Sequence, residues 1–169
     1  MPRLSAEQRH RVRFTLNGRA VEAEAEPRML LTDFLRQDLF MTGVHVGCEH
    51  GVCGACTIEI DGVPARACLM LAVQADGASI RTVEALAPAP GRLSVLQEAF
   101  RRHHALQCGF CTAGILMSLD SYLRDHREPT EADLREFLGG HLCRCTGYVP
   151  ILAAALDAAQ RLRETSANA

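Results

Sequence analysis

Eight cysteines in two groups of four constrain this 169-residue chain more than any other feature. The first group is Cys48, Cys53, Cys56 and Cys68, and the second is Cys108, Cys111, Cys143 and Cys145. The stretch 1–13 is polar and lacks the apolar core of a secretory signal, so we expect a cytoplasmic protein. In a reducing compartment, clustered thiols are typical of metal ligands or redox groups rather than of disulfides. The two groups therefore predict two metal or redox sites.

The first group has the spacing C-x4-C-x2-C followed by a remote fourth cysteine, which is the plant-type pattern for a 2Fe-2S cluster. Gly47, Gly51 and Gly54 suit a loop that wraps a cluster, because such a loop needs positive φ angles and a close approach of the backbone. The alternative is a structural zinc site. Zinc prefers two C-x2-4-C pairs, and Cys68 has no near partner in the sequence, so the pattern favours the cluster.

The second group combines C-x2-C with a remote C-x-C, and each pair precedes an expected helix. Helix N-termini favour thiolates because free N–H groups and a partial positive charge face them. From the spacing alone, a 2Fe-2S cluster, a zinc site and a redox pair all stay open. His45, His50 and His141 lie close to the cysteines in sequence. Such histidines can donate hydrogen bonds to cluster sulfurs, and the alternative that we favour is that they are polar residues of the surface or of loops.

The hydrophobic pattern divides the chain into a sheet half and a helical half. Alternation and turn residues predict two hairpins, a crossing helix and one further strand, over residues 10–16 with 20–25, 30–39, 57–60 with 63–68, and 79–82. Apolar residues at helical spacing then predict four helices, over about 93–103, 113–123, 130–138 and 148–163. We therefore expect an α+β chain with a compact four-helix bundle in its second half.

The prolines at 88 and 90 mark the one stretch that resembles a connector between these halves. The expected organisation is a tail at 1–9, a domain at 10–82, a connector at 83–91, a domain at 92–163 and a tail at 164–169.

Charge and hydropathy exclude several functions. The net charge is −2 and the two halves are balanced, so no basic face for nucleic acid is indicated. The longest apolar runs, 67–73 and 151–156, fall far short of the roughly 20 residues that cross a bilayer. No Ser-His-Asp order, carboxylate pair or phosphate-binding loop stands out, so we expect no catalytic residue on this chain. Two redox centres without a group for bond chemistry indicate a one-electron relay.

Three motifs carry a family resemblance: GCEHGVCGACT at 47–57, QCGFCT at 107–112 and LCRCTGY at 142–148. In this order they resemble the small iron–sulfur subunit of the xanthine oxidase family of molybdenum hydroxylases, over residues 10–163. The resemblance implies an N-terminal β-grasp, 2Fe-2S ferredoxin-like domain and a C-terminal four-helix domain that binds a second 2Fe-2S cluster. All eight cysteines become cluster ligands by this resemblance. Two departures are Ala113, where the family usually has proline, and His141, where asparagine is frequent.

The resemblance also implies partner subunits. Relatives assemble with a large molybdopterin subunit and a medium FAD subunit, and electrons pass from molybdenum through the helical-domain cluster and the ferredoxin-like cluster to FAD. Gln107 and Cys145 then lie against the pterin. The resemblance favours a dimer of such heterotrimers. The alternative is a free-standing ferredoxin-like carrier without a fixed enzyme partner.

Overall fold

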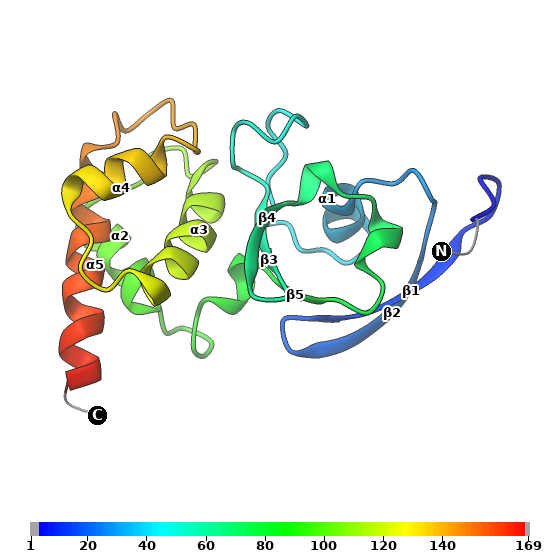
Figure 1. The fold of residues 1–169 in the computed structure, drawn as a ribbon, viewed down its shortest axis with the longest axis horizontal. Coiled ribbons are helices and arrows are strands. Elements are labelled where there is room, and N and C mark those ends of the chain that lie inside the picture. Colours follow the sequence, from blue (N-terminus) through cyan, green and yellow to red (C-terminus); the bar gives the residue numbers. More distant parts are fainter. Residues whose placement is uncertain (1–3, 168–169) are drawn as a thin grey trace.

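The computed structural model describes residues 4–167, and it separates a sheet half from a helical half (Figure 1). The α+β class expected from the sequence is confirmed. Of the two expected tails, residues 1–3 and 168–169 lie outside the described residues. Among the helices within residues 4–167, none has the length and apolar character that crossing a lipid bilayer requires.

A five-stranded sheet forms the first half, with strand order β2-β1-β5-β3-β4. Its strands are β1 (His10–Leu16), β2 (Arg19–Ala25), β3 (Thr57–Ile60), β4 (Val63–Arg66) and β5 (Ser79–Arg81). β1 and β5 are parallel, and the other neighbours are antiparallel. Both hairpins turn through pairs with positive φ, Asn17-Gly18 and Asp61-Gly62, as expected for tight turns.

The second hairpin is shorter than the sequence predicts. β4 ends at Arg66, and Ala67–Leu69 form a 3-10 turn, η2. This turn leaves the strand direction and buries Cys68, whose exposure is 4%. In the sequence, the alternation typical of a strand continues through residue 68, so this pattern alone does not show where the pairing of β4 with β3 ends.

The expected helix over 30–39 is present, in two parts. α1 (Leu31–Asp33) continues as a π-helical turn, η1 (Phe34–Asp38), in which the Leu39 N–H bonds the Phe34 carbonyl at 3.2 Å. Its inner face fills the core of the sheet half together with strand residues. The buried side chains in this core include Phe14, Leu31, Phe34, Leu35, Ile58 and Ile80.

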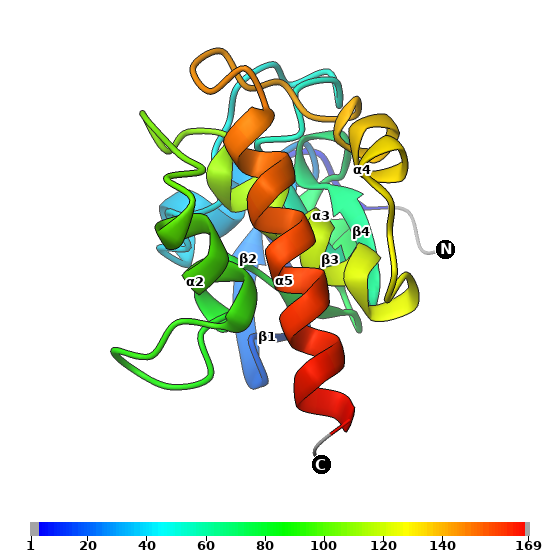
Figure 2. The ribbon, with the colours of Figure 1, turned by 90° about the vertical axis from the view of Figure 1, so that its left-hand side faces the viewer.

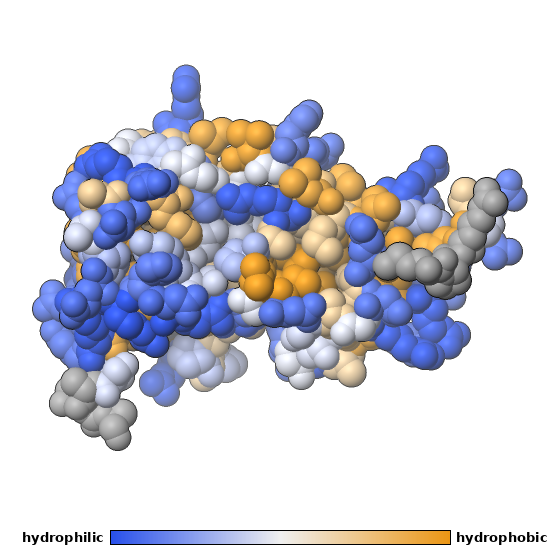
Figure 3. Space-filling model, viewed as in Figure 1, coloured by the Kyte–Doolittle hydropathy of each residue, from blue (hydrophilic) through white to orange (hydrophobic). Residues whose placement is uncertain are grey.

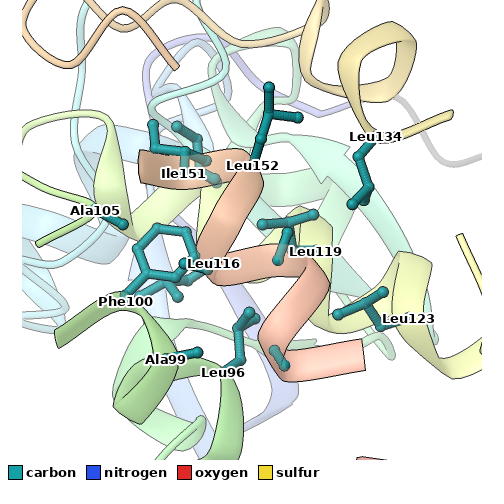
Figure 4. Packing of buried hydrophobic residues seen from close by; sticks show 14 of the residues in the cluster. Leu96, Ala99, Phe100, Ala105, Leu116, Leu119, Leu123, Leu134, Ile151 and Leu152 are labelled. Carbon is teal, nitrogen blue, oxygen red and sulfur yellow. The ribbon is translucent and has the colours of Figure 1, made fainter. Parts of the chain in front are cut away.

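Four helices form the second half, as expected: α2 (Val95–Arg102), α3 (Thr112–Asp125), α4 (Glu131–Leu138) and α5 (Val149–Ala167). Ser94 caps α2 and Thr130 caps α4, each bonding the backbone N–H three residues on. Figure 4 shows leucine, isoleucine and phenylalanine side chains from all four helices meeting in one core. α5 runs on to Ala167, through most of the segment expected to be a tail, and the hydroxyls of Thr165 and Ser166 donate to the carbonyls of Arg161 and Leu162.

α3 lies between the sheet and the remaining helices, packed against β3 and β4 (Figure 1). Figure 2, viewed from the helical side, shows α5 in front of this layer. The expected connector takes part in the packing as well. Val83–Ala85 form a 3-10 turn, η4, and Leu86 is buried in the helical core. The chain therefore passes between the halves along a packed boundary.

Candidate metal centres

The two cysteine-bearing loops lie at the same end of the molecule. Figures 1 and 2 agree in placing the loop before β3, drawn in cyan, and the loop before α5, drawn in orange, at the upper end. Figure 3 shows apolar atoms on the surface along this upper edge. None of the eight cysteines, all of which lie within the described residues, forms a disulfide.

In the first loop, backbone amides surround the Cys48 sulfur. The N–H groups of His50 and Cys53 donate to Cys48 Sγ at 3.4 and 3.3 Å. These bonds lower the pKa of the free Cys48 thiol to about 6. The loop curls by positive φ at Glu49, Gly51 and Gly54. This arrangement stabilises a thiolate and is what a cluster ligand needs.

The two remaining thiols of the first group lie deeper. Cys56 is 2% exposed, and burial, with the neighbouring Cys68 thiol, raises the pKa of Cys56 to about 11. A Cβ on Gly47 would lie 3.0 Å from Cys53 Sγ, so glycine keeps room beside this sulfur. The four thiols thus meet as a Cys48–Cys53 pair and a Cys56–Cys68 pair.

The second group brings together residues that are far apart in the sequence. Cys108 and Cys145 lie with their sulfurs 3.5 Å apart, and Cys143 is a close neighbour of Cys111. Cys111 is the N-terminal cap residue of α3, and the Cys143–Cys145 turn leads into α5. Burial raises the pKa of Cys111 to about 12. The Thr146 hydroxyl lies 3.1 Å from Cys143 Sγ.

Both donor sets fit a 2Fe-2S cluster. Such a cluster takes four thiolates, two on each of its irons. Each group here supplies four thiols as two close pairs. Among the described residues, no three His, Cys, Asp or Glu side chains surround one point in the manner of a single-ion site.

The second site reaches the surface. Cys108, Cys145 and Gln107 are exposed. Three apolar side chains close to these cysteines in sequence, Leu106, Phe110 and Leu142, are 42%, 47% and 57% exposed. This end of the helical half therefore presents sulfur and apolar carbon outward, as a surface covered by another subunit would.

His45, His50 and His141 all lie in loops, as expected, and His50 is exposed, but His141 is buried. His141 is 3% exposed, its Nε2 lies 2.8 Å from Ser118 Oγ, and burial lowers its pKa to about 4. His45 stacks on Phe110, with its Nδ1 2.7 Å from the Phe110 carbonyl oxygen, and so links the two cysteine loops. His141 lies in a loop, as expected, but its side chain is buried, and its sequence neighbours hold no signal for this burial because its partner Ser118 is remote in the chain.

Comparison with known proteins supports the two-site organisation. Residues 14–79 match the family model described as a 2Fe-2S iron-sulfur cluster binding domain, and residues 82–156 match that of a 2Fe-2S binding domain. The chain is 57% identical to the caffeine dehydrogenase subunit gamma of Pseudomonas sp. (strain CBB1), over 86% of this chain and 88% of that one. It is 57% identical to the nicotine 6-hydroxylase small subunit of Paenarthrobacter nicotinovorans, over 85% and 86%.

Solved structures agree. The quinoline 2-oxidoreductase of Pseudomonas putida 86 superposes with a TM-score of 0.89 at 50% identity, covering 94% of this chain and 98% of the matched chain. The aldehyde oxidoreductase of Desulfovibrio gigas gives a TM-score of 0.85 at 39% identity, with 92% of this chain and 17% of that longer chain covered. This chain therefore belongs to the small iron–sulfur subunits of the xanthine oxidase family of molybdenum hydroxylases and has their two 2Fe-2S binding domains.

Proposed function

We propose that this chain is the electron-transfer subunit of a heterotrimeric molybdenum hydroxylase. It relays electrons one at a time from a molybdopterin centre in a large partner subunit, through two 2Fe-2S clusters, to FAD in a medium partner subunit. The observation that carries the proposal is the pair of four-thiol sites at one end of the molecule, one of which reaches the surface at Cys108 and Cys145.

The ligands follow from the pairing of the thiols. Cys48, Cys53, Cys56 and Cys68 hold the ferredoxin-like cluster, and Cys108, Cys111, Cys143 and Cys145 hold the helical-domain cluster. The clusters supply one-electron carriers. The chain's own residues bind them, give them hydrogen bonds, and shield the inner irons from water.

The exposed edge of the second site is where the molybdopterin subunit docks. Gln107 is exposed directly beside the exposed Cys108, so its amide can bond a polar group of the pterin next to the sulfur. At the first site, Val52 and Leu69 are 62% and 63% exposed beside Cys53 and Cys68, which suits the FAD subunit. Apolar surface at both sites favours permanent partners over the free-standing carrier.

The substrate class comes from the relatives. Their names refer to caffeine, nicotine and quinoline, which are nitrogen heterocycles. We infer a nitrogen heterocycle as the substrate of the complex, bound by the large subunit. A dimer of heterotrimers stays a prediction from the resemblance, and the mass of the purified complex tests it. A cytoplasmic location stays a prediction from the sequence.

Purification through a tag on this chain tests the assembly. We expect about four iron and four labile sulfide per chain, with molybdenum and two larger subunits eluting together. The same iron content without molybdenum would support the free-standing carrier. Zinc in place of iron would overturn both the heterotrimer subunit and the free-standing carrier.

The relay itself is tested by Cys108→Ser and Cys145→Ser. Each variant should stop steady-state turnover, while substrate still reduces the molybdenum centre once. Gln160→Ala, an exposed change on α5, is the matched control and should turn over normally. Full turnover in either cysteine variant would overturn the relay.

A further inference from the structure

A histidine of the ferredoxin-like half bonds the backbone of the first cysteine pair of the helical half. His45 Nδ1 lies 2.7 Å from the Phe110 carbonyl oxygen, and the two rings stack with their centroids 4.9 Å apart. Because a carbonyl oxygen only accepts, Nδ1 carries the proton and donates it. His45 therefore supplies an N–H to the turn between Cys108 and Cys111, which belong to the second thiol group.

The Phe110 ring also lies against the first cysteine loop. A Cβ on Gly47 would lie 3.5 Å from Phe110 Cε1 and 3.0 Å from Cys53 Sγ, so the ring meets backbone that carries no side chain there. The Phe110 side chain is 47% exposed, so burial alone does not fix its position. The stack with His45 and the contact at Gly47 together keep the Phe110 carbonyl within reach of His45 Nδ1.

The Phe110 carbonyl and the Cys111 N–H are the two ends of one peptide group. A hydrogen bond to the carbonyl oxygen polarises this group and makes its N–H a stronger donor. Burial raises the pKa of the Cys111 thiol, and the hydrogen-bonding interaction of the Cys111 N–H with its own sulfur opposes that rise. One peptide group therefore connects the His45 donor to the sulfur of Cys111.

A donor that strengthens an N–H at a ligand sulfur acts on the redox behaviour of the cluster. One-electron reduction adds a negative charge to the cluster, and hydrogen bonds to its sulfurs stabilise that charge and raise the reduction potential. At Cys143, the nearby hydroxyl belongs to Thr146 of the same turn, 3.1 Å from Sγ. At Cys111, the strengthening donor comes from the opposite half of the molecule. The second site therefore receives an electrostatic contribution from a residue outside its own domain.

We propose that His45 raises the reduction potential of the helical-domain cluster through its hydrogen bond to the Phe110 carbonyl. His45 is a positioning residue, because it acts on the cluster only through the peptide group between Phe110 and Cys111. The inference rests on the proposed function, which takes the second thiol group as the ligands of that cluster. When the two clusters share one electron, a higher potential at the helical-domain cluster keeps a larger share of that electron there. No covalent bond forms or breaks, and no proton moves.

A redox titration of the purified complex, monitored by EPR, measures the midpoint potential of each cluster from its separate signal. His45→Phe keeps an aromatic ring against Phe110 and removes the N–H that bonds the carbonyl. We expect the potential of the helical-domain cluster to fall and that of the ferredoxin-like cluster to stay unchanged. In the half-reduced complex, the ratio of the two reduced clusters should shift severalfold toward the ferredoxin-like cluster.

His126 offers a matched control with the same local geometry. Its Nδ1 lies 3.0 Å from the Tyr122 carbonyl oxygen, and its ring stacks on Tyr122 with centroids 4.1 Å apart. This pair lies at the end of α3 opposite to Cys111, so His126→Phe makes the same chemical change far from the cysteines. Both potentials should stay unchanged in His126→Phe, and equal shifts in the two variants would overturn the inference.

His45→Ala is the second variant, and it removes both the ring and the N–H. The potential of its helical-domain cluster should fall as far as in His45→Phe, because the same hydrogen bond is lost. An unchanged potential in either variant would overturn the inference. A merely structural His45 would lower the free energy of unfolding without moving the potential, and that result would overturn the inference as well.

The iron content of every variant and of the unmodified complex accompanies each titration. Missing clusters in the unmodified complex would contradict the proposed function. Two clusters in the unmodified complex and in His45→Phe, with the same potentials in both, would overturn the present inference alone.

Discussion

Gly114 at the start of α3 lies so close to Gly54 that a Cβ on Gly114 would stand 2.1 Å from the Gly54 carbonyl oxygen. Gly54 has a φ of +77°, and a Cβ there would lie 2.6 Å from Cδ2 of His141. These two glycines let the first cysteine loop, α3 and residues 140–143 meet with almost no side chain between them. The close approach of the two sites therefore depends on Gly54 and Gly114, which have no side chain and cannot bind a metal through one.

Gly114→Ala tests this contact. Alanine favours a helix over glycine by up to about 1 kcal/mol, so helix propensity alone predicts stabilisation. We expect instead a loss of about 1–3 kcal/mol in the free energy of unfolding, because the added methyl overlaps backbone that cannot move aside. Chemical denaturation of the cluster-loaded protein measures this loss.

Gly140→Ala is the matched control. It lies at the same boundary, but the nearest atoms to its Cβ would be 3.6 Å away, which is ordinary van der Waals contact. Equal stability losses in the two variants would contradict a specific role for the Gly114–Gly54 contact.

An ion-pair network also joins the halves. Glu59 of β3, with its side chain 10% exposed, pairs with Arg81 and with Arg124 of α3, and Arg81 also pairs with Asp120. The hydrogen bond that the Arg124 guanidinium donates to the Glu59 carboxylate raises the pKa of Arg124. Glu59→Gln removes the carboxylate that two guanidinium groups share, so we expect the free energy of unfolding to fall by about 2–3 kcal/mol.

Glu22→Gln provides the comparison. Glu22 pairs with Arg13 at 2.7 Å, but their side chains are 51% and 62% exposed, and such surface pairs contribute about 0–1 kcal/mol. Denaturation of both variants at low and high salt separates the two cases. A Glu59→Gln loss no larger than that of Glu22→Gln would show that the network adds nothing to the boundary between the halves.

The sequence predicted the parts of this molecule that depend on local pattern. The hairpin turns at Asn17-Gly18 and Asp61-Gly62, the Thr130 cap and the four helices follow from residue types a few positions apart. Cysteine spacing and the three motifs likewise predicted two 2Fe-2S domains, which the family models confirm.

The boundary between the halves could not be predicted in the same way. His141 contacts Ser118, Glu59 contacts Arg124, and Leu142 contacts Cys53, and each pair is far apart in the chain. Periodicity reports which face of an element is buried and not what lies against it. The sequence contained a weak signal for Gly114, since glycine is unfavourable inside a helix unless close packing requires it.

Tyr148 connects the chemistry of the second site to its fold. Its φ is +68°, a backbone conformation that a bulky residue rarely adopts, and its hydroxyl holds both the His141 carbonyl and the Cys143 N–H. Tyr148→Phe keeps the ring and leaves these two backbone groups without that partner. We expect the free energy of unfolding to fall by about 1–3 kcal/mol, and the helical-domain cluster to be lost faster than the ferredoxin-like cluster.

The decay of each cluster's EPR signal in air, together with chemical denaturation, measures both effects. Tyr122→Phe is the matched control, because Tyr122 packs through its ring on His126 and Phe137, away from the cysteines, and phenylalanine preserves that stacking. If the Tyr148 hydroxyl positions Cys143, it slows the loss of the helical-domain cluster and leaves the loss of the ferredoxin-like cluster unchanged. If both clusters decayed equally fast in Tyr148→Phe, the hydroxyl would contribute only to general stability, and residues 140–143 would be held by Arg66 and by the Leu142–Cys53 hydrogen bond instead.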